Sequence, residues 1–210
     1  MNEAQNILKK YFGYENFRPG QEELIDHILS KEDVLGIMPT GAGKSVCYQV
    51  PAMILDGITI VISPLISLMK DQVDSLNEIG IPATFINSTL SYNNYEQTIE
   101  NIIHNVYKII YVAPERLNSD TFLNLLNKIN ISMITIDEAH CVSQWGHDFR
   151  SSYRRIRRVI SLLRNRPIVT AFTATATDEV RKDIVNLLKL NNPKVFISGF
   201  DRKNLKIIIE

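Results

Sequence analysis

The fold of this chain is decided by the stretch Val34-Leu35-Gly36-Ile37-Met38-Pro39-Thr40-Gly41-Ala42-Gly43-Lys44-Ser45. Its apolar first part predicts a strand, and an apolar helical stretch follows Ser45. The glycines let the backbone turn tightly, so that N–H groups face an anion at the positive end of the helix. This order predicts a phosphate-binding loop, although Met38 stands where the strict pattern has glycine. A glycine turn that only caps the helix is the alternative interpretation.

Short β-branched runs alternate with helical stretches along the rest of the chain. Helical periodicity marks 65–76 and 178–190, and the polar segment 87–105 predicts a loop followed by a surface helix. Apolar strands that alternate with helices form parallel sheets covered on both faces, so we predict a three-layer α/β/α sandwich with a mainly parallel sheet. Ligands bind such sheets at the carboxyl ends of the strands. The expected strands are Val34–Met38, Thr59–Ser63, Ala83–Asn87, Lys108–Ala113, Met133–Asp137, Ile168–Thr173 and Val195–Ser198.

Composition indicates an ordinary globular protein, with 210 residues that are 45% hydrophobic and 22% charged. We expect a helical preface over residues 1–30 and a larger unit over 31–210, together forming one structural domain. No apolar run is long enough to span a membrane, and no signal peptide is evident. With two cysteines and no export signal, we expect a reduced, cytoplasmic protein without a zinc site. The formal net charge of zero means that nucleic-acid binding must depend on local patches.

A second candidate site follows the apolar run Ile131–Ile136, which ends in Asp137-Glu138-Ala139-His140. Asp137 at a strand end can hold Mg²⁺ through water, and Glu138 can orient and deprotonate an attacking water. Lys44 would reach the β- and γ-phosphates of ATP, and the Ser45 hydroxyl would ligate the same Mg²⁺. Together these residues predict a nucleotide-hydrolysis site, whereas an acidic strand end by itself is common in loops.

The run Asp-Glu-Ala-His resembles the signature of superfamily 2 helicases, and its surroundings resemble the RecQ family. Residues 141–150 (CVSQWGHDFR) are similar to the aromatic-rich loop of that family, and residues 12–21 (FGYENFRPGQ) to its adenine-reading motif. Further matches are residues 63–72, 113–117 and 173–177; Lys203 departs from the proline expected near the end. The resemblance, from Phe12 to Asn204, implies a P-loop NTPase with a RecA-like fold. It also implies the motor of an ATP-dependent 3′-to-5′ DNA helicase in DNA repair and recombination.

The adenine-reading resemblance assigns a base-contacting role to three residues. The side-chain amide of Gln21 can pair with the N6 donor and N7 acceptor of adenine together. Tyr14 and Arg18 offer flat surfaces that can stack on the purine. The alternative is that this segment staples the first helix, with Phe12 and Phe17 in the core.

The aromatic-rich loop is the predicted site of contact with single-stranded or duplex DNA, through Gln144, Trp145, His147, Phe149 and Arg150. Aromatic side chains stack on unpaired bases, and arginine binds phosphates. A DNA-sensing loop here could shift Glu138 or His140, and the resemblance implies that it couples DNA binding to hydrolysis. The alternative is that Trp145 and Phe149 fill the core.

Other strand ends are secondary candidates. Helices that open after Ser63 and at 114–116 can bind backbone phosphates without sequence preference. Thr173 and Thr175 end a strand beside the site, and the resemblance implies that they link hydrolysis to DNA contact. Four arginines crowd one helix together with an apolar stripe (Arg154, Arg155, Arg157 and Arg158), and a solvated helix face is the favoured interpretation of that cluster.

The resemblance also indicates what lies outside this chain. Phosphoryl transfer usually needs an added positive charge on the γ-phosphate, which in this family comes from a second RecA-like motor domain. The sequence stops at Glu210, where that domain would begin. We therefore expect the isolated chain to bind ATP weakly, hydrolyse it slowly and unwind nothing. An RNA helicase motor domain and a non-catalytic nucleotide-binding module remain as alternatives.

Overall fold

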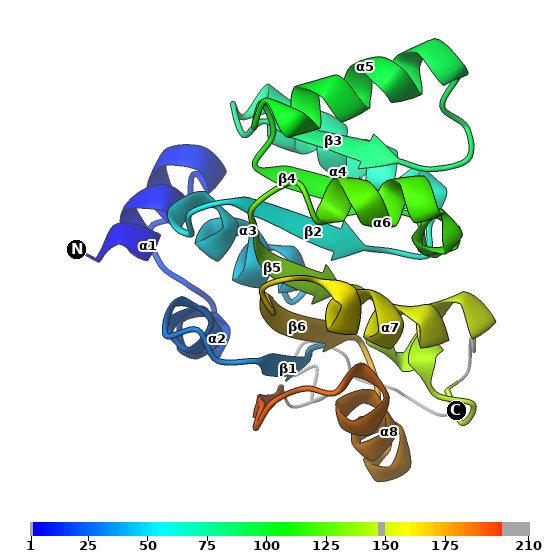
Figure 1. Ribbon diagram of the computed structural model, residues 1–210. Coiled ribbons are helices and arrows are strands. Elements are labelled where there is room, and N and C mark those ends of the chain that lie inside the picture. Colours follow the sequence, from blue (N-terminus) through cyan, green and yellow to red (C-terminus); the bar gives the residue numbers. More distant parts are fainter. Residues whose placement is uncertain (1, 147–149, 199–210) are drawn as a thin grey trace, which may run out of the picture.

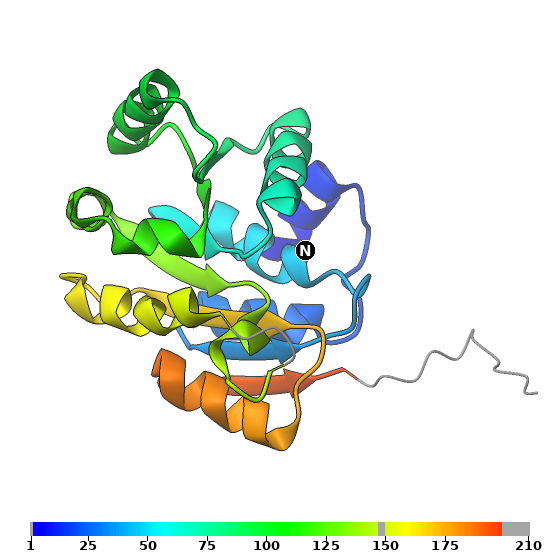
Figure 2. The same ribbon diagram turned by 90° about the vertical axis from the view of Figure 1, so that its right-hand side faces the viewer.

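The computed structural model describes residues 2–146 and 150–198 as one seven-stranded, all-parallel sheet between two layers of helices (Figures 1 and 2). The strand order is β3-β4-β2-β5-β6-β1-β7. All seven predicted strands are present, each within a few residues of its expected bounds. The strands are β1 Val34–Ile37, β2 Ile58–Ile62, β3 Ala83–Ile86, β4 Ile109–Val112, β5 Ile131–Ile136, β6 Ile168–Thr173 and β7 Lys194–Ile197.

The helices divide between the two faces of the sheet, as Figure 2 shows from the side. α2, α3 and α4 cover one face, and α5, α6, α7 and α8 cover the other. The expected surface helix after residue 87 is α5. The helices are α1 Glu3–Ile7, η1 Leu8–Phe12, α2 Gln21–Leu29, α3 Lys44–Ile54, α4 Ile66–Glu78, α5 Tyr92–Ile103, η2 Pro114–Asn118, α6 Asp120–Leu126, η3 Ala139–Val142, η4 Ser151–Tyr153, α7 Arg154–Leu162 and α8 Asp178–Leu188.

The central strands are buried because both of their faces are covered. β1, β2, β4 and β6 consist entirely of buried residues, which explains their continuous apolar runs. The amino-terminal helices belong to the same body: Ala4, Leu8 and Ile25 pack against Val46 and Val50 of α3. This packing fixes the start of α2 beside the start of α3. Within the described ranges, no helix combines the length and apolar character needed to cross a membrane.

The amino-terminal edge of the sheet is tied together by one carboxylate. Asp33, which precedes β1, is 2% exposed and accepts hydrogen bonds from the backbone N–H groups of Val169 (2.9 Å) and Asn191 (2.6 Å). Arg166 also forms an ion pair with Asp33. These contacts join β1 to β6 and to the segment before β7, because each partner lies next to one of those strands. The candidate site lies at the opposite edge, where the strands have their carboxyl ends.

Candidate functional site

The glycine-rich segment forms a loop between β1 and α3. Gly41 and Gly43 both have left-handed backbones, with φ of 83° and 82°. Only glycine adopts such angles readily, so the loop depends on these two positions. Gly43 immediately precedes α3, and the ammonium group of Lys44 donates to the carbonyl oxygen of Met38 (3.1 Å). The side chain of Lys44 therefore folds back over the loop.

The acidic residues follow β5 at the same edge of the sheet. The backbone N–H of Glu138 donates to Asp137 Oδ1 (3.0 Å), and the Tyr153 hydroxyl donates to the Asp137 carbonyl oxygen (3.0 Å). Glu138 has φ of 48°, a left-handed conformation that a residue with a side chain seldom adopts. This backbone turn ends β5 and starts η3, and such unusual conformations cluster at functional sites.

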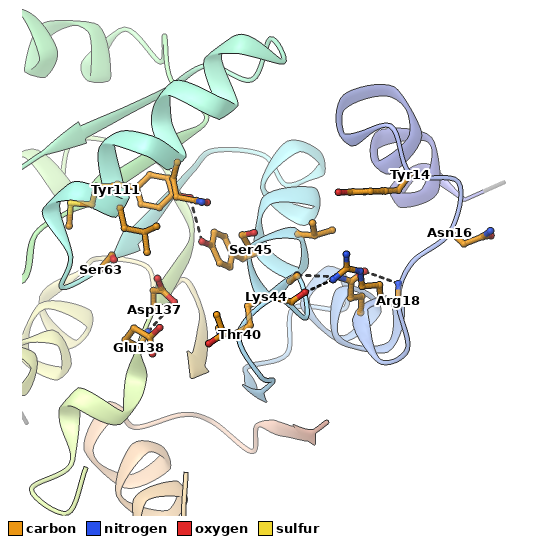
Figure 3. Close-up of a pocket in the computed structure, with 18 residues that line it drawn as sticks. Tyr14, Asn16, Arg18, Thr40, Lys44, Ser45, Ser63, Tyr111, Asp137 and Glu138 are labelled. Carbon is orange, nitrogen blue, oxygen red and sulfur yellow. Dashed lines mark hydrogen bonds between the residues drawn. The ribbon is translucent and has the colours of Figure 1, made fainter. Parts of the chain in front are cut away.

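The loop and the acidic residues line one cavity of about 400 Å³. Figure 3 shows Thr40, Lys44 and Ser45 on one side of it and Asp137 and Glu138 on the other. Strand β6 alone separates β1 from β5, so the two halves stand two strand spacings apart, roughly 10 Å. Ser63, at the end of β2, also lines this cavity. Residues nearly a hundred positions apart in sequence are thus brought together.

Asp137 has unusual electrostatics. Burial, followed by the nearby charge of Glu138, raises the pKa of its carboxyl from 3.8 to about 6. The Glu138 N–H, the Lys44 ammonium and the Ser63 hydroxyl act in the opposite direction and lower that pKa, but they offset only part of the rise. A buried carboxylate next to a second acid and incompletely neutralised favours a cation beside it.

His140 links the acidic residues to the end of β6. Its Nδ1 lies 2.7 Å from the Thr173 hydroxyl and 3.3 Å from Glu138 Oε2, and its side chain is buried. The Thr173 hydroxyl is also 3.3 Å from the carbonyl oxygen of Thr175, whereas the side chain of Thr175 is exposed. Thr173, His140 and Glu138 therefore form a contiguous polar chain at the bottom of the site.

The base-reading candidates lie at the other end of the cavity, which Tyr14, Asn16, Arg18 and Gln21 line (Figure 3). Tyr14 is 54% exposed and its ring is open to a ligand. The Gln21 amide, in contrast, is buried and engaged with the chain: Oε1 accepts from the Arg18 backbone N–H (2.8 Å), and Nε2 donates to the Gly43 carbonyl (3.0 Å). Arg18 donates to the Gly41 carbonyl. Both side chains hold the glycine-rich loop.

The back wall of the cavity was not anticipated from the sequence. Tyr48 and Tyr111 approach with their hydroxyls 3.4 Å apart, and Gln49 Nε2 donates to both the Tyr111 hydroxyl (3.1 Å) and Gln72 Oε1 (3.1 Å). These residues come from α3, β4 and α4. Burial raises the pKa of Tyr111 to about 12, so its hydroxyl stays protonated. Gln72 ends the matching stretch 63–72, but no motif marks Tyr48, Gln49 or Tyr111, which only the sheet topology brings to Gln72.

The residues predicted to contact nucleic acid fall into different settings. Trp145 is 78% exposed and Gln144 is exposed, so Trp145 does not fill the core. Arg150 donates to the Pro64 carbonyl (3.0 Å), which joins this segment to the end of β2. His147 and Phe149 lie outside the described residues, as do Lys203 and the rest of 199–210.

A helix begins at Pro114, as expected, but it is a short 3₁₀ helix. Residues Pro114–Asn118 form the 3₁₀ helix η2, and no α-helix opens at Pro114. Arg116 turns back to donate to the Asn87 carbonyl (3.2 Å), and its guanidinium lies 5.0 Å from the centre of the Tyr95 ring. Arg116 therefore contacts the chain itself and the Tyr95 ring.

Comparison with known proteins identifies the class of protein. Residues 18–184 match the DEAD/DEAH box helicase family. The match covers most of the chain, which therefore belongs to this family.

Two curated relatives narrow this assignment. The chain is 49% identical over 206 residues to the ATP-dependent DNA helicase RecQ of Bacillus subtilis, which covers 98% of this chain and 35% of that protein. It is 46% identical over 203 residues to the RecQ of Pasteurella multocida, covering 97% of this chain and 32% of that protein. The resemblance to the RecQ family is confirmed, and the chain spans about a third of the length of these relatives.

The fold is confirmed independently by solved structures. A crystal structure of a hypothetical ATP-dependent RNA helicase from Sulfolobus tokodaii matches with a TM-score of 0.70 at 22% sequence identity. The match covers 94% of this chain and 57% of that one. At this identity the likeness concerns the fold, and it agrees with the predicted helicase-type α/β domain.

Proposed function

We propose that this chain is the first motor domain of an ATP-dependent DNA helicase with 3′-to-5′ polarity, which acts in DNA repair and recombination in the bacterial cytoplasm or nucleoid. The observation that carries the proposal is the shared cavity of Lys44, Ser45, Asp137 and Glu138. The names of the relatives, both ATP-dependent DNA helicases, support DNA as the partner. The glycine-rich loop and the acidic strand end supply the two halves of a site for ATP hydrolysis.

The donor atoms in the cavity fit Mg-ATP. Lys44 and the backbone N–H groups of the loop supply positive charge for the phosphates of ATP. The Ser45 hydroxyl and the Asp137 carboxylate are oxygen ligands of the kind that Mg²⁺ prefers, Asp137 acting through water. Bound Mg²⁺ would neutralise charge on the transferring phosphoryl group. The raised pKa of Asp137 supports this fit, since a cation nearby would relieve its buried charge.

Glu138 is the proposed general base. Its carboxylate lines the cavity and can orient the attacking water and accept its proton. His140 contacts both Glu138 Oε2 and the Thr173 hydroxyl, so it holds the base in position and connects it to the end of β6. Thr175 and Ser63, at neighbouring strand ends, would report DNA contact to this chain of residues.

Adenine recognition is assigned to Tyr14, Arg18 and Gln21. The exposed ring of Tyr14 can stack on the base. For Gln21 to pair with adenine, its amide must give up its hydrogen bond to the Gly43 carbonyl oxygen and form hydrogen bonds with the base instead. Arg18 would likewise give up its hydrogen bond to the Gly41 carbonyl oxygen. Base recognition would therefore alter how the glycine-rich loop is held.

The nucleic-acid surface is assigned to the segment after the acidic residues. Trp145 is exposed for stacking on an unpaired base, and Gln144 is exposed beside it. Arg150, together with His147 and Phe149, completes the predicted set. Because this segment begins three residues after Glu138, DNA bound there can change the position of the base.

The partner domain is also part of the proposal. A second RecA-like motor domain of the same full-length protein would supply the positive charge that stabilises the γ-phosphate in the transition state, worth about 10³–10⁵ in rate. The chain on its own is therefore expected to hydrolyse ATP slowly and to unwind no duplex.

The test measures ATP hydrolysis by the full-length protein with single-stranded DNA, with RNA of the same length and with neither. We expect DNA to stimulate turnover. Glu138→Gln should lower the DNA-stimulated rate about 10²–10⁴-fold while ATP affinity is retained. Glu78→Gln, which removes an exposed carboxylate at the end of α4, is the matched control and should have no effect. Duplexes with a 3′ or a 5′ single-stranded tail test the polarity.

The outcomes separate the alternatives. Stimulation by RNA alone would identify an RNA helicase. ATP binding without turnover, in the wild type as well as in the variant, would identify a non-catalytic nucleotide-binding module. Unchanged turnover in Glu138→Gln would refute the role of that residue.

A further inference from the structure

Helix α7 presents an unusually basic face to the solvent. Ile156, Val159 and Ile160 are buried against the sheet, which fixes the opposite side of the helix outward. That outer side carries four exposed arginines, Arg154, Arg155, Arg157 and Arg158, within nine residues. From the helical repeat, Arg154 and Arg158 point directly away from the core, and Arg155 and Arg157 lie on its two flanks.

This arrangement is unfavourable for an isolated helix. Residues three or four apart are neighbours on a helix, so 154 with 157, 154 with 158 and 155 with 158 form three like-charge pairs. The amino end of a helix carries a partial positive charge, which also disfavours arginine in the first turn. α7 has no acidic residue in its first turn, and its N-cap residue, Tyr153, makes no side-chain capping bond. An anion on this face would relieve both effects.

The neighbouring helix does not supply that anion. α7 packs against α8, whose three acidic residues are engaged elsewhere. Asp178 pairs with Arg181, Glu179 hydrogen-bonds with its own backbone and Thr177, and Asp183 accepts from the Ser143 hydroxyl (2.7 Å). Within residues 2–146 and 150–198, no ion pair to Arg155, Arg157 or Arg158 is present. A solvated helix face normally mixes both signs of charge, and this one does not.

The basic face begins at the edge of the sheet that carries the candidate site. η4 leads directly into α7, and its Tyr153 donates to the Asp137 carbonyl oxygen (3.0 Å). In Figure 1 the first turn of α7 lies at the end of the sheet toward which β5 and β6 point. Exposed Trp145 belongs to the segment immediately before it. An aromatic side chain followed by a row of arginines is the combination that binds single-stranded nucleic acid.

We propose that the outer face of α7 binds the phosphate backbone of a nucleic-acid strand, and that this surface extends the contact made at Trp145. The inference rests on the proposed function, and it replaces the solvated-face interpretation that the sequence favours. Guanidinium groups bind phosphate oxygens with strong, charge-assisted hydrogen bonds and read no bases. Binding at α7 is therefore independent of sequence and strongly dependent on salt.

The experiment measures binding of a fluorescent oligothymidine to this chain, by anisotropy, between about 50 and 200 mM salt. The variant is Arg155→Gln/Arg158→Gln, which removes two neighbouring charges of the outer face. Each phosphate contact to a single strand contributes about −0.7 to the slope of log K against log salt. Over this fourfold range the wild type should thus lose about sevenfold more affinity than the variant.

Two controls isolate the charges. Lys31→Gln/Lys128→Gln removes two exposed charges directly before β1 and β5, at the opposite edge, and should keep the wild-type slope. Arg155→Lys/Arg158→Lys keeps the charge and should keep most of the slope. Affinity for a fluorescent ATP analogue, expected to equal the wild-type value, verifies that each variant is folded.

Each result decides a different point. A wild-type slope in Arg155→Gln/Arg158→Gln would overturn the α7 surface and leave the proposed function standing. An equal loss in the opposite-edge control would also overturn it, because the effect would then follow net charge. Failure of the wild-type chain and of the full-length protein to bind any strand would overturn the proposed function as well.

Discussion

Replacing Asp137 by asparagine is expected to stabilise the chain at pH 8, although it removes a proposed magnesium ligand. The pKa of this carboxyl rises from 3.8 to about 6 on folding, mainly because it is buried. At about 1.4 kcal/mol per pH unit, that rise corresponds to about 3 kcal/mol. Because the folded pKa is the higher one, the stabilising contribution of the protonated form is complete below about pH 4 and is lost as the pH passes through about 6. Asparagine is neutral throughout and avoids this loss.

The assay is urea unfolding of the wild type and Asp137→Asn at pH 4 and at pH 8. The two free energies of unfolding should agree closely at pH 4, and the variant should be more stable by about 3 kcal/mol at pH 8. For a chain of this size the melting temperature would rise by about 6–12 °C. Asp74→Asn, an exposed position on α4, should show no difference at either pH. A variant that is equally or less stable at pH 8 would refute the reasoning.

Two further substitutions address the opposite edge of the sheet and the floor of the site. Asp33→Ala leaves Arg166 and the N–H groups of Val169 and Asn191 without the buried carboxylate that accepts their hydrogen bonds, so urea unfolding should show a loss of about 3 kcal/mol. Asp26→Ala, an exposed control, should lose little, and a similar loss in both would contradict this account. Thr173→Val removes the hydroxyl 2.7 Å from His140, so DNA-stimulated ATP turnover of the full-length protein should fall about tenfold, the worth of one hydrogen bond of about 1.4 kcal/mol, with ATP affinity unchanged. A matching fall in ATP affinity would instead indicate a structural role for Thr173.

The sequence predicts the sheet well because its signal is local. Runs such as Ile58–Ile62 and Ile168–Thr173 are buried on both faces, so every residue in them is apolar or a small hydroxyl residue. The order of the strands in the sheet could not be predicted in this way, because it depends on contacts between residues far apart in sequence, such as Val34 with Thr170. Periodicity carries no information about such pairs.

The candidate site likewise has one part that the sequence predicts and another that it does not. Lys44 and Asp137 can be predicted to meet, because each follows a strand of one parallel sheet. The wall that Tyr48 and Tyr111 form with Gln72 could not be predicted, since both tyrosines lie in the middle of their elements and belong to no motif. The hydrogen bond from Gln21 to the glycine-rich loop could not be predicted for another reason. The motif indicates that Gln21 contacts adenine, but it does not show which atoms the side chain contacts when no nucleotide is bound.

The position of β1 in the sheet has a consequence for synthesis of the protein on the ribosome. Among the strands of the described sheet, β1 is made first, yet both of its neighbours, β6 and β7, are made last. At about 5–20 residues per second, roughly ten to thirty seconds separate the translation of Ile37 from that of Ile197. During this interval the strand that carries the glycine-rich loop has no pairing partner. The nascent chain therefore acquires its nucleotide site only after β6 and β7 have been made, through contacts of long sequence separation that form slowly.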